Sequence, residues 1–230
     1  MTLPSVTASS AVDMGAGGNG TTFVLTRPGA WISGKTAEVG IYKENNAAIT
    51  PPSGWVLVDS FNSGSNFWCY TYRKVLGGSE PSTYTWSWTG SVWREGGGFC
   101  LDNTDQTTPE DAATPVHQAN AASTTTTVPA ITPVTSNTLL VAWGFIFNDE
   151  TWTPASGLSR ATSNVIRAYC GAVETGPAAG VSSGTNTFTT IGSFANVGMQ
   201  HAVQEVQGGG GASTGAPARR RPYRFFRRAA

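Results

Sequence analysis

The sequence predicts an all-β fold: a two-sheet, jelly-roll-like β-sandwich built from two related halves and followed by a flexible C-terminal arm. Three observations lead to this fold class. Only 12% of the residues are charged, while 28 of the 230 are glycine, a composition that favours short strands and turns over amphipathic helices. Short apolar runs separated by turn residues begin at Thr21. Finally, segments of the first half recur in the second.

The strands of the first half are predicted from its apolar runs. The clearest run is Thr83–Thr89, in which Tyr84, Trp86 and Trp88 alternate with hydroxyl residues, so that three aromatic rings share one face and are expected to pack in the core. The other runs that predict strands are residues 22–26, 37–42, 55–61 and 67–75. The tryptophans expected to be exposed, because they lie near turns, are Trp31, Trp93 and Trp152.

An internal repeat relates the two halves. The segment Thr50-Pro-Pro-Ser-Gly-Trp55 recurs 103 residues later as Thr153-Pro-Ala-Ser-Gly-Leu158, and residues 33–41 align with 136–144 at the same offset. Each Thr-Pro-x-Ser-Gly segment predicts a turn in which proline fixes φ early and glycine supplies a positive φ. Because each half has too few strands to bury both faces, the halves are expected to pair into one sandwich of about eight to ten strands.

The domain organisation follows changes in composition. Residues 102–127 are polar and without periodicity, which predicts a surface crossover of Greek-key type. After residue 206 a Gly-rich stretch predicts a flexible linker, with a reach of about 18 Å over residues 208–218. The predicted parts are an extended lead-in (1–20), the sandwich (21–206, with halves 21–101 and 124–206), the linker (207–218) and an Arg-rich arm (219–230).

The arm is the strongest functional signal in the sequence. Six of the 14 basic residues lie in it, so the rest of the chain has 8 basic residues against 14 acidic ones. An acidic body with a basic arm indicates a separate partner for the arm and disfavours nucleic-acid binding by the body. Arginine binds carboxylates and phosphates and stacks on aromatic rings. The predicted partner-binding residues are Arg219, Arg220, Arg221, Tyr223, Arg224, Phe225, Phe226, Arg227 and Arg228.

Three interpretations of the arm remain open. Docking into an acidic and apolar groove of a neighbouring subunit is the leading one, and contact with nucleic acid is an alternative. A solvated tail is the third, although two adjacent phenylalanines, Phe225 and Phe226, argue against it because exposed apolar rings reduce solubility.

Four motifs resemble one known module. They are Thr50–Asp59 (TPPSGWVLVD), Tyr72–Val75 (YRKV), Ser79–Pro81 (SEP) and Tyr84–Trp86 (YTW). Together they are similar to a β-sandwich module of tail and other virion proteins of actinobacterial tailed bacteriophages, and of some bacterial surface proteins, over most of residues 22–206. The chain departs from the pattern at residues 34–39 and 100–105. The resemblance implies a virion protein made in the host cytoplasm, with other virion proteins as partners and a homo-oligomeric assembly, and it implies no catalytic residue.

The sequence contains no motif that is typical of an enzyme or of a metal site. The three cysteines lack CxxC spacing, which predicts buried free thiols. His117 and His201 are far apart and lack a nucleophile motif, so structural or surface roles are favoured. The acidic residues of the crossover, Asp102, Asp105, Glu110 and Asp111, lack the spacing of a calcium loop. We therefore expect a non-enzymatic protein with no cofactor and no metal.

The sequence also lacks a secretory signal and an apolar run of about 18 residues, so no membrane span is expected. The predicted function is that of a bacteriophage minor tail protein anchored by its arm. The alternatives are a capsid decoration protein and a carbohydrate-binding module that attaches to a host-surface glycan.

Overall fold

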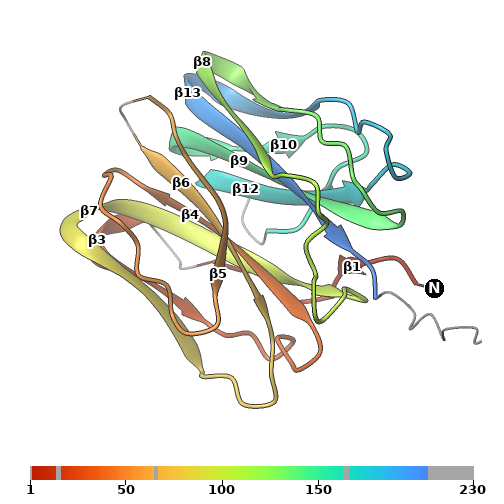
Figure 1. Cartoon of the computed structure of the whole chain (residues 1–230). Helices are drawn as coiled ribbons and strands as arrows, with labels where there is room; N and C mark the ends of the chain where they lie inside the picture. Colours follow the sequence, from red (N-terminus) through yellow and green to blue (C-terminus); the bar gives the residue numbers. More distant parts are fainter. Residues whose placement is uncertain (1, 14–16, 65–66, 163–165, 207–230) are drawn as a thin grey trace, which may run out of the picture.

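The computed structural model describes residues 2–13, 17–64, 67–162 and 166–206, and it confirms the predicted all-β, two-sheet sandwich (Figure 1). Every described strand belongs to one of two antiparallel sheets. The first sheet contains β1 (Ser5–Val6), β2 (Val12–Asp13), β3 (Gly18–Thr26), β4 (Thr36–Lys43), β5 (Val56–Asn62), β6 (Trp68–Val75) and β7 (Thr83–Asp102). The second contains β8 (Val116–Val128), β9 (Thr138–Thr151), β10 (Thr153–Pro154), β11 (Ser159–Arg160), β12 (Ile166–Thr175) and β13 (Asn186–Gln204).

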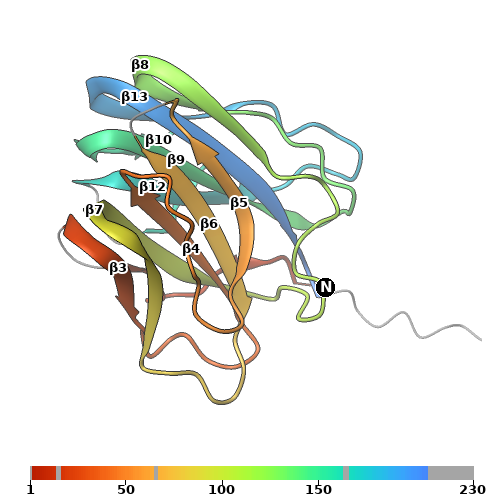
Figure 2. The same cartoon turned by 60° about the vertical axis from the view of Figure 1, so that its left-hand side comes forward.

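Each sheet comes from one half of the chain, and the two sheets have the same strand order. The order is β3-β7-β4-β6-β5 in the first and β8-β13-β9-β12-β11 in the second, and the two sheets lie face to face (Figure 2). The register follows the sequence offset as well. Val39 pairs with Gly98 on β7, and its counterpart Ala142 pairs with Gln200 on β13. The sequence repeat is therefore a repeat of structure.

The two Thr-Pro-x-Ser-Gly turns are equivalent, as the sequence predicts. Gly54 has a φ of 80° and Gly157 a φ of 102°, values in the left-handed region that glycine adopts without a steric penalty. The N–H of Trp55 donates to Pro52 O over 3.2 Å, and the N–H of Leu158 donates to Ala155 O over 3.1 Å. These segments thus have a local structural role in both halves.

The predicted surface crossover at residues 102–127 is wrong in its second part. Residues 116–128 form β8, an edge strand that pairs with β13. Only Thr126 and Val128 of this strand are buried. An edge strand with both faces largely in water needs no apolar alternation, so its polar sequence gave no strand signal.

The described residues form four apolar clusters, of which the smallest contains Ala113, Ile131, Leu140 and Ala202. The inner core lies between the two sheets and contains Tyr42, Phe67, Phe99, Trp143, Phe145, Tyr169 and Met199. The first outer core covers the other face of the first sheet with Phe23, Trp31, Trp55, Tyr70, Tyr72, Tyr84, Trp86 and Trp88. The second outer core covers the other face of the second sheet with Val128, Ala142, Ile146, Trp152, Leu158, Cys170 and Phe188. Each half therefore buries both faces of its sheet.

The predicted packing of Tyr84, Trp86 and Trp88 is confirmed, but the predicted exposure of Trp31 and Trp152 is wrong. Trp31 is fully buried, and its indole N–H donates to Ser10 O over 2.7 Å. Trp152 packs edge-on against Phe188. Both residues do lie next to turns, but these turns fold back over an outer core. Proximity to a turn in sequence is thus a poor guide to exposure here.

In the inner core, residues of very different size occupy equivalent positions in the two halves. Gly40 and Trp143 occupy the same place in the two halves, and the Trp143 ring fills the space beside Gly40, where an added Cβ would lie 2.6 Å from the ring. Gly171 leaves room on the other side, since a Cβ there would lie 2.8 Å from the same ring. A large residue of one half therefore packs where its counterpart has no side chain.

Candidate functional site

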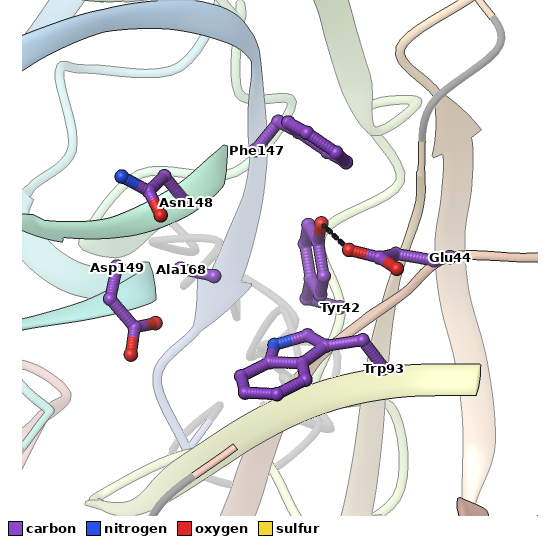
Figure 3. Close-up of a pocket in the computed structure, with 7 residues that line it drawn as sticks. All are labelled: Tyr42, Glu44, Trp93, Phe147, Asn148, Asp149 and Ala168. Atoms are coloured by element: carbon purple, nitrogen blue, oxygen red, sulfur yellow. Dashed lines mark hydrogen bonds between the residues drawn. The ribbon is translucent and has the colours of Figure 1, made fainter. Parts of the chain in front are cut away.

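A pocket of about 380 Å³ opens between the two halves at one end of the sandwich (Figure 3). Its lining comes from the end of β4, from β7, from the outer part of β9 and from β12. The lining residues are Tyr42, Glu44, Trp93, Phe147, Asn148, Asp149 and Ala168. Because the first three belong to one half and the last four to the other, the pocket exists only when the halves are packed together.

One wall of the pocket is fixed by hydrogen bonds. The Tyr42 hydroxyl donates to Glu44 Oε1 over 3.1 Å, and the N–H of Glu44 donates to Trp93 O over 3.1 Å. Burial first, and then the Glu44 carboxylate, raise the pKa of Tyr42 far above its ordinary value. The phenol therefore stays protonated and holds the carboxylate in place as a hydrogen-bond donor.

Two aromatic side chains present their surfaces to solvent at the pocket. Trp93 is 36% exposed and Phe147 is 40% exposed. Phe147 stacks on Phe67 with 6.4 Å between ring centroids, and Phe67 lies 4.8 Å from Tyr42. Phe147 thus rests on aromatic rings of the inner core. The predicted exposure of Trp93 is confirmed.

The pocket carries negative charge. Glu44 and Asp149 provide two carboxylates, Asn148 adds an amide, and no lysine or arginine is among the lining residues that the structure describes. Beneath them, the buried carboxylate of Glu95 accepts the N–H of Ala168 over 2.8 Å, which ties the first half to the second. Carboxylates beside exposed rings can bind a cation through charge and cation–π contact, or the hydroxyls and C–H face of a sugar.

The arm residues predicted to bind a partner, Arg219 to Arg228, lie outside the described residues. The body to which they are attached ends at a defined place. The N–H of Val206 donates to Asn103 O over 3.0 Å, and Thr104 next to it is hydrogen-bonded to Thr36 at the start of β4. We call this end of the sandwich, formed by Thr36, Asn103 and Val206, the base. The pocket lies at the other end of β4.

The three cysteines are buried free thiols, as predicted. Burial raises the pKa of the Cys69, Cys100 and Cys170 thiols, the last to about 11. A thiol that stays protonated at neutral pH is a weak nucleophile. These residues therefore act as small core side chains.

Both histidines join the two sheets. His117 on β8 accepts or donates a 2.8 Å hydrogen bond with Asp59 on β5 and stacks on Phe61 at 4.0 Å. His201 on β13 is buried and lies 3.3 Å from the equally buried Glu38 carboxylate on β4. Neither histidine reaches the pocket lining, and each contributes a polar contact between the halves.

Each acidic residue of the predicted crossover has its own partners, and they do not gather at one site. Asp102 pairs with Lys35 at 2.9 Å, and Glu110 pairs with Arg73 at 3.0 Å. Asp105 accepts the N–H groups of two following threonines. Asp111 accepts from Ala113, Val134 and Thr135. No group of three or more potential metal ligands occurs in the described part of the chain.

The motifs that carry the family resemblance form a local structural cluster. Glu80 of the Ser-Glu-Pro motif pairs with Lys74 at 2.8 Å and accepts from the Tyr84 hydroxyl and the Gly77 N–H. Burial alone would raise the pKa of Glu80, but these hydrogen bonds outweigh it and lower the pKa. The motif residues therefore stabilise the connection between β6 and β7 and lie away from the pocket.

Comparisons with protein families, with curated proteins and with solved structures find no match for this chain. Among the described residues no helix is long and apolar enough to cross a membrane. Sequence reasoning identified Trp93 but missed Tyr42, Glu44, Phe147 and Asp149. What these residues share is a position at the ends of two equivalent central strands, β4 and β9. The sequence repeat shows that these two strands are equivalent.

Proposed function

We propose that this protein is a non-enzymatic structural protein of a bacteriophage particle, a minor tail protein whose basic, aromatic arm docks on neighbouring virion subunits. The observation that carries this proposal is that the two ends of the body differ. The chain leaves the sandwich at the base, and the acidic, aromatic pocket lies at the opposite end. A module anchored through the arm at its base would present the pocket end outward.

The packing of the body supports a structural role. Both outer cores and the inner core are sealed, and the histidines and thiols are used in packing between and within the sheets. Two covalently linked, complementary halves give a stiff unit. A stiff unit with one binding arm suits a component that is added to a particle in fixed orientation.

Deletion of the arm tests the proposal. All described strands lie between Ser5 and Gln204, so a chain ending at residue 218 is expected to fold as the full chain does. It should be absent from purified particles, whereas a full-length control with Arg219→Lys should be incorporated. Normal incorporation of the shortened chain would contradict the proposal. Immuno-gold labelling of particles carrying the full chain then distinguishes a tail position from capsid decoration.

A carbohydrate-binding role in host attachment is the second candidate, and the exposed rings of Trp93 and Phe147 favour it. Aromatic faces beside carboxylate and amide groups are suited to sugar binding. A glycan array probed with the full chain and with a Trp93→Ala variant tests this role. Signal from a defined glycan that disappears in the variant would support it, and absence of any signal from the full chain would exclude it on that array.

A further inference from the structure

We infer that the pocket is the docking site for the arm of a second copy of this chain. The inference rests on the proposed function, in which the arm is an anchor, and names the arm's partner. Its first support is complementary charge. The pocket contributes Glu44 and Asp149, and the arm contributes six arginines within ten residues. A guanidinium group can form two parallel hydrogen bonds with a carboxylate.

The second support is complementary shape and chemistry around the charges. The exposed rings of Trp93 and Phe147 lie on two sides of Tyr42, with Glu44 and Asp149 on the other two sides (Figure 3). Arginine stacks on such faces more favourably than lysine does, and the arm interleaves its arginines with Tyr223, Phe225 and Phe226. A pocket of about 380 Å³ is at the small end of the range for ligand sites. It has room for one or two side chains as anchors, with the remaining arm residues outside.

A neutral sugar can donate hydroxyl hydrogen bonds to these carboxylates, but it brings no positive charge to them. A guanidinium group brings both hydrogen bonds and positive charge, and the described lining has no lysine or arginine that would supply that charge. The charge of the pocket therefore favours the arm over a neutral glycan as its occupant.

The third support is the position of the two parts. Thr36 at the base and Tyr42 at the pocket are separated along β4 by about 20 Å at 3.4 Å per residue. The last residues of β13 run toward the base (Figure 1), where the N–H of Val206 donates to Asn103 O, and the pocket lies at the opposite end of β4. If copies are arranged head to tail, the base of one lies next to the pocket of another. The composition predicts a linker reach of about 18 Å for connecting the arm to the base.

Head-to-tail contacts use two different surfaces, so they propagate into rings or open filaments. This property fits a particle component present in several copies. It also predicts a specific behaviour in solution. The full chain should self-associate in a concentration-dependent and salt-sensitive manner, because the contact is between opposite charges.

A mixing experiment with purified full-length variants tests the inference. The pocket variant carries Glu44→Gln, Asp149→Asn and Trp93→Ala and keeps its arm. The arm variant carries serine at all six arginines and at Phe225 and Phe226 and keeps its pocket. Each alone should be monomeric by sedimentation velocity, with self-association about 30-fold or more weaker than in the unmodified chain. An equimolar mixture should form a 1:1 dimer, since one intact pocket and one intact arm remain.

A matched control removes two carboxylates elsewhere. Asp105→Asn with Glu174→Gln changes the charge equally and keeps an oxygen for the hydrogen bonds that these residues accept, so self-association should be unchanged. A monomeric unmodified chain, a mixture without dimer, or a pocket variant that associates normally would each overturn the inference. If the pocket variant associates normally but loses glycan binding, the pocket is a sugar site. Because the measurement uses purified chain alone, its outcome is independent of particle incorporation.

Discussion

The two halves have the same strand order and register but differ in side-chain size at several equivalent positions on both faces. In the first half the outer face carries the large rings, including Trp55, Tyr70 and Tyr72, while its inner face has Gly40 and Gly97. At the equivalent positions the second half has Leu158, Cys170 and Ala172 outside and Trp143 and Met199 inside. At the Gly40 position the large ring of Trp143 therefore packs where its counterpart has no side chain, and such unequal pairs let the two inner faces fit together.

The largest expected effect is at Trp143, because it fills the space beside Gly40 and Gly171 in the inner core. Trp143→Ala should lower the free energy of unfolding by about 3–5 kcal/mol. Urea denaturation measures the loss. Trp93→Ala, which truncates an exposed tryptophan, is the matched control and should cost far less. Equal losses for both variants would mean that the inner core does not hold the halves together.

The next prediction compares the two outer cores. Trp86 lies within 6.0 Å, between ring centroids, of Phe23, Trp55 and Tyr72, whereas its counterpart Phe188 has one such partner, Trp152. Trp86→Ala should therefore cost near the top of the range of about 3–5 kcal/mol and Phe188→Ala near the bottom. Thermal and urea unfolding of both variants provide the values. A greater loss for Phe188→Ala would contradict the assignment of the larger aromatic core to the first half.

A smaller effect is expected from adding a methyl group at Gly40. Gly40→Ala places a Cβ against the Trp143 ring and should cost about 1–3 kcal/mol. Combining it with Trp143→Leu should cost less than the sum of the two single variants, because the smaller side chain makes room for the methyl group. Additive losses in this double-mutant cycle would show that the two positions do not pack on each other.

The smallest effect concerns Lys43, whose counterpart in the second half is Ile146. Burial lowers the pKa of Lys43 to about 8. Between pH 8 and about 10.5 the unfolded chain keeps a proton on Lys43 that the folded chain has lost, so Lys43 contributes a rise in stability with pH, on the order of 1 kcal/mol from pH 8 to 9. The raised pKa values of the three buried thiols and of Tyr70, the last about 12, make stability fall with rising pH, so the contribution of Lys43 is measured as a difference between two chains. The stability of the unmodified chain minus that of Lys43→Ile should increase by this amount from pH 8 to 9, and a difference that does not change with pH would contradict the prediction.

The sequence was sufficient for the equivalent turns and for five strands of the first half, but not for β1 and β2, which lie in the predicted lead-in. Alternation at Tyr84, Trp86 and Trp88 reflects a strand with one buried face, and Gly54 and Gly157 reflect a backbone requirement. Strand β8 was missed because an exposed edge strand imposes no apolar pattern. A structural feature could be predicted where a local requirement, such as one buried strand face or a positive φ, leaves a pattern in the neighbouring residues.

The pocket could be predicted only in part, because it is built from residues about 100 positions apart. Trp93 was identified through its turn, whereas Tyr42 and Phe147 read as ordinary strand residues. Which ring is exposed depends on how the two sheets pack on each other. That packing includes contacts between the halves, such as Trp143 against Gly40, which no single segment of sequence contains.

The most direct test of the central claim, that the arm of one copy binds the pocket of another, is cross-linking between isotopically distinct copies. A photoreactive phenylalanine analogue at Phe226 would be placed in ordinary chains, and these would be mixed with chains labelled with heavy isotopes. Cross-linked peptides are expected to join the light arm to heavy peptides containing Tyr42–Glu44 or Phe147–Asp149. Cross-links confined to peptides of the same light chain, or directed to the base of the heavy chain, would contradict the claim.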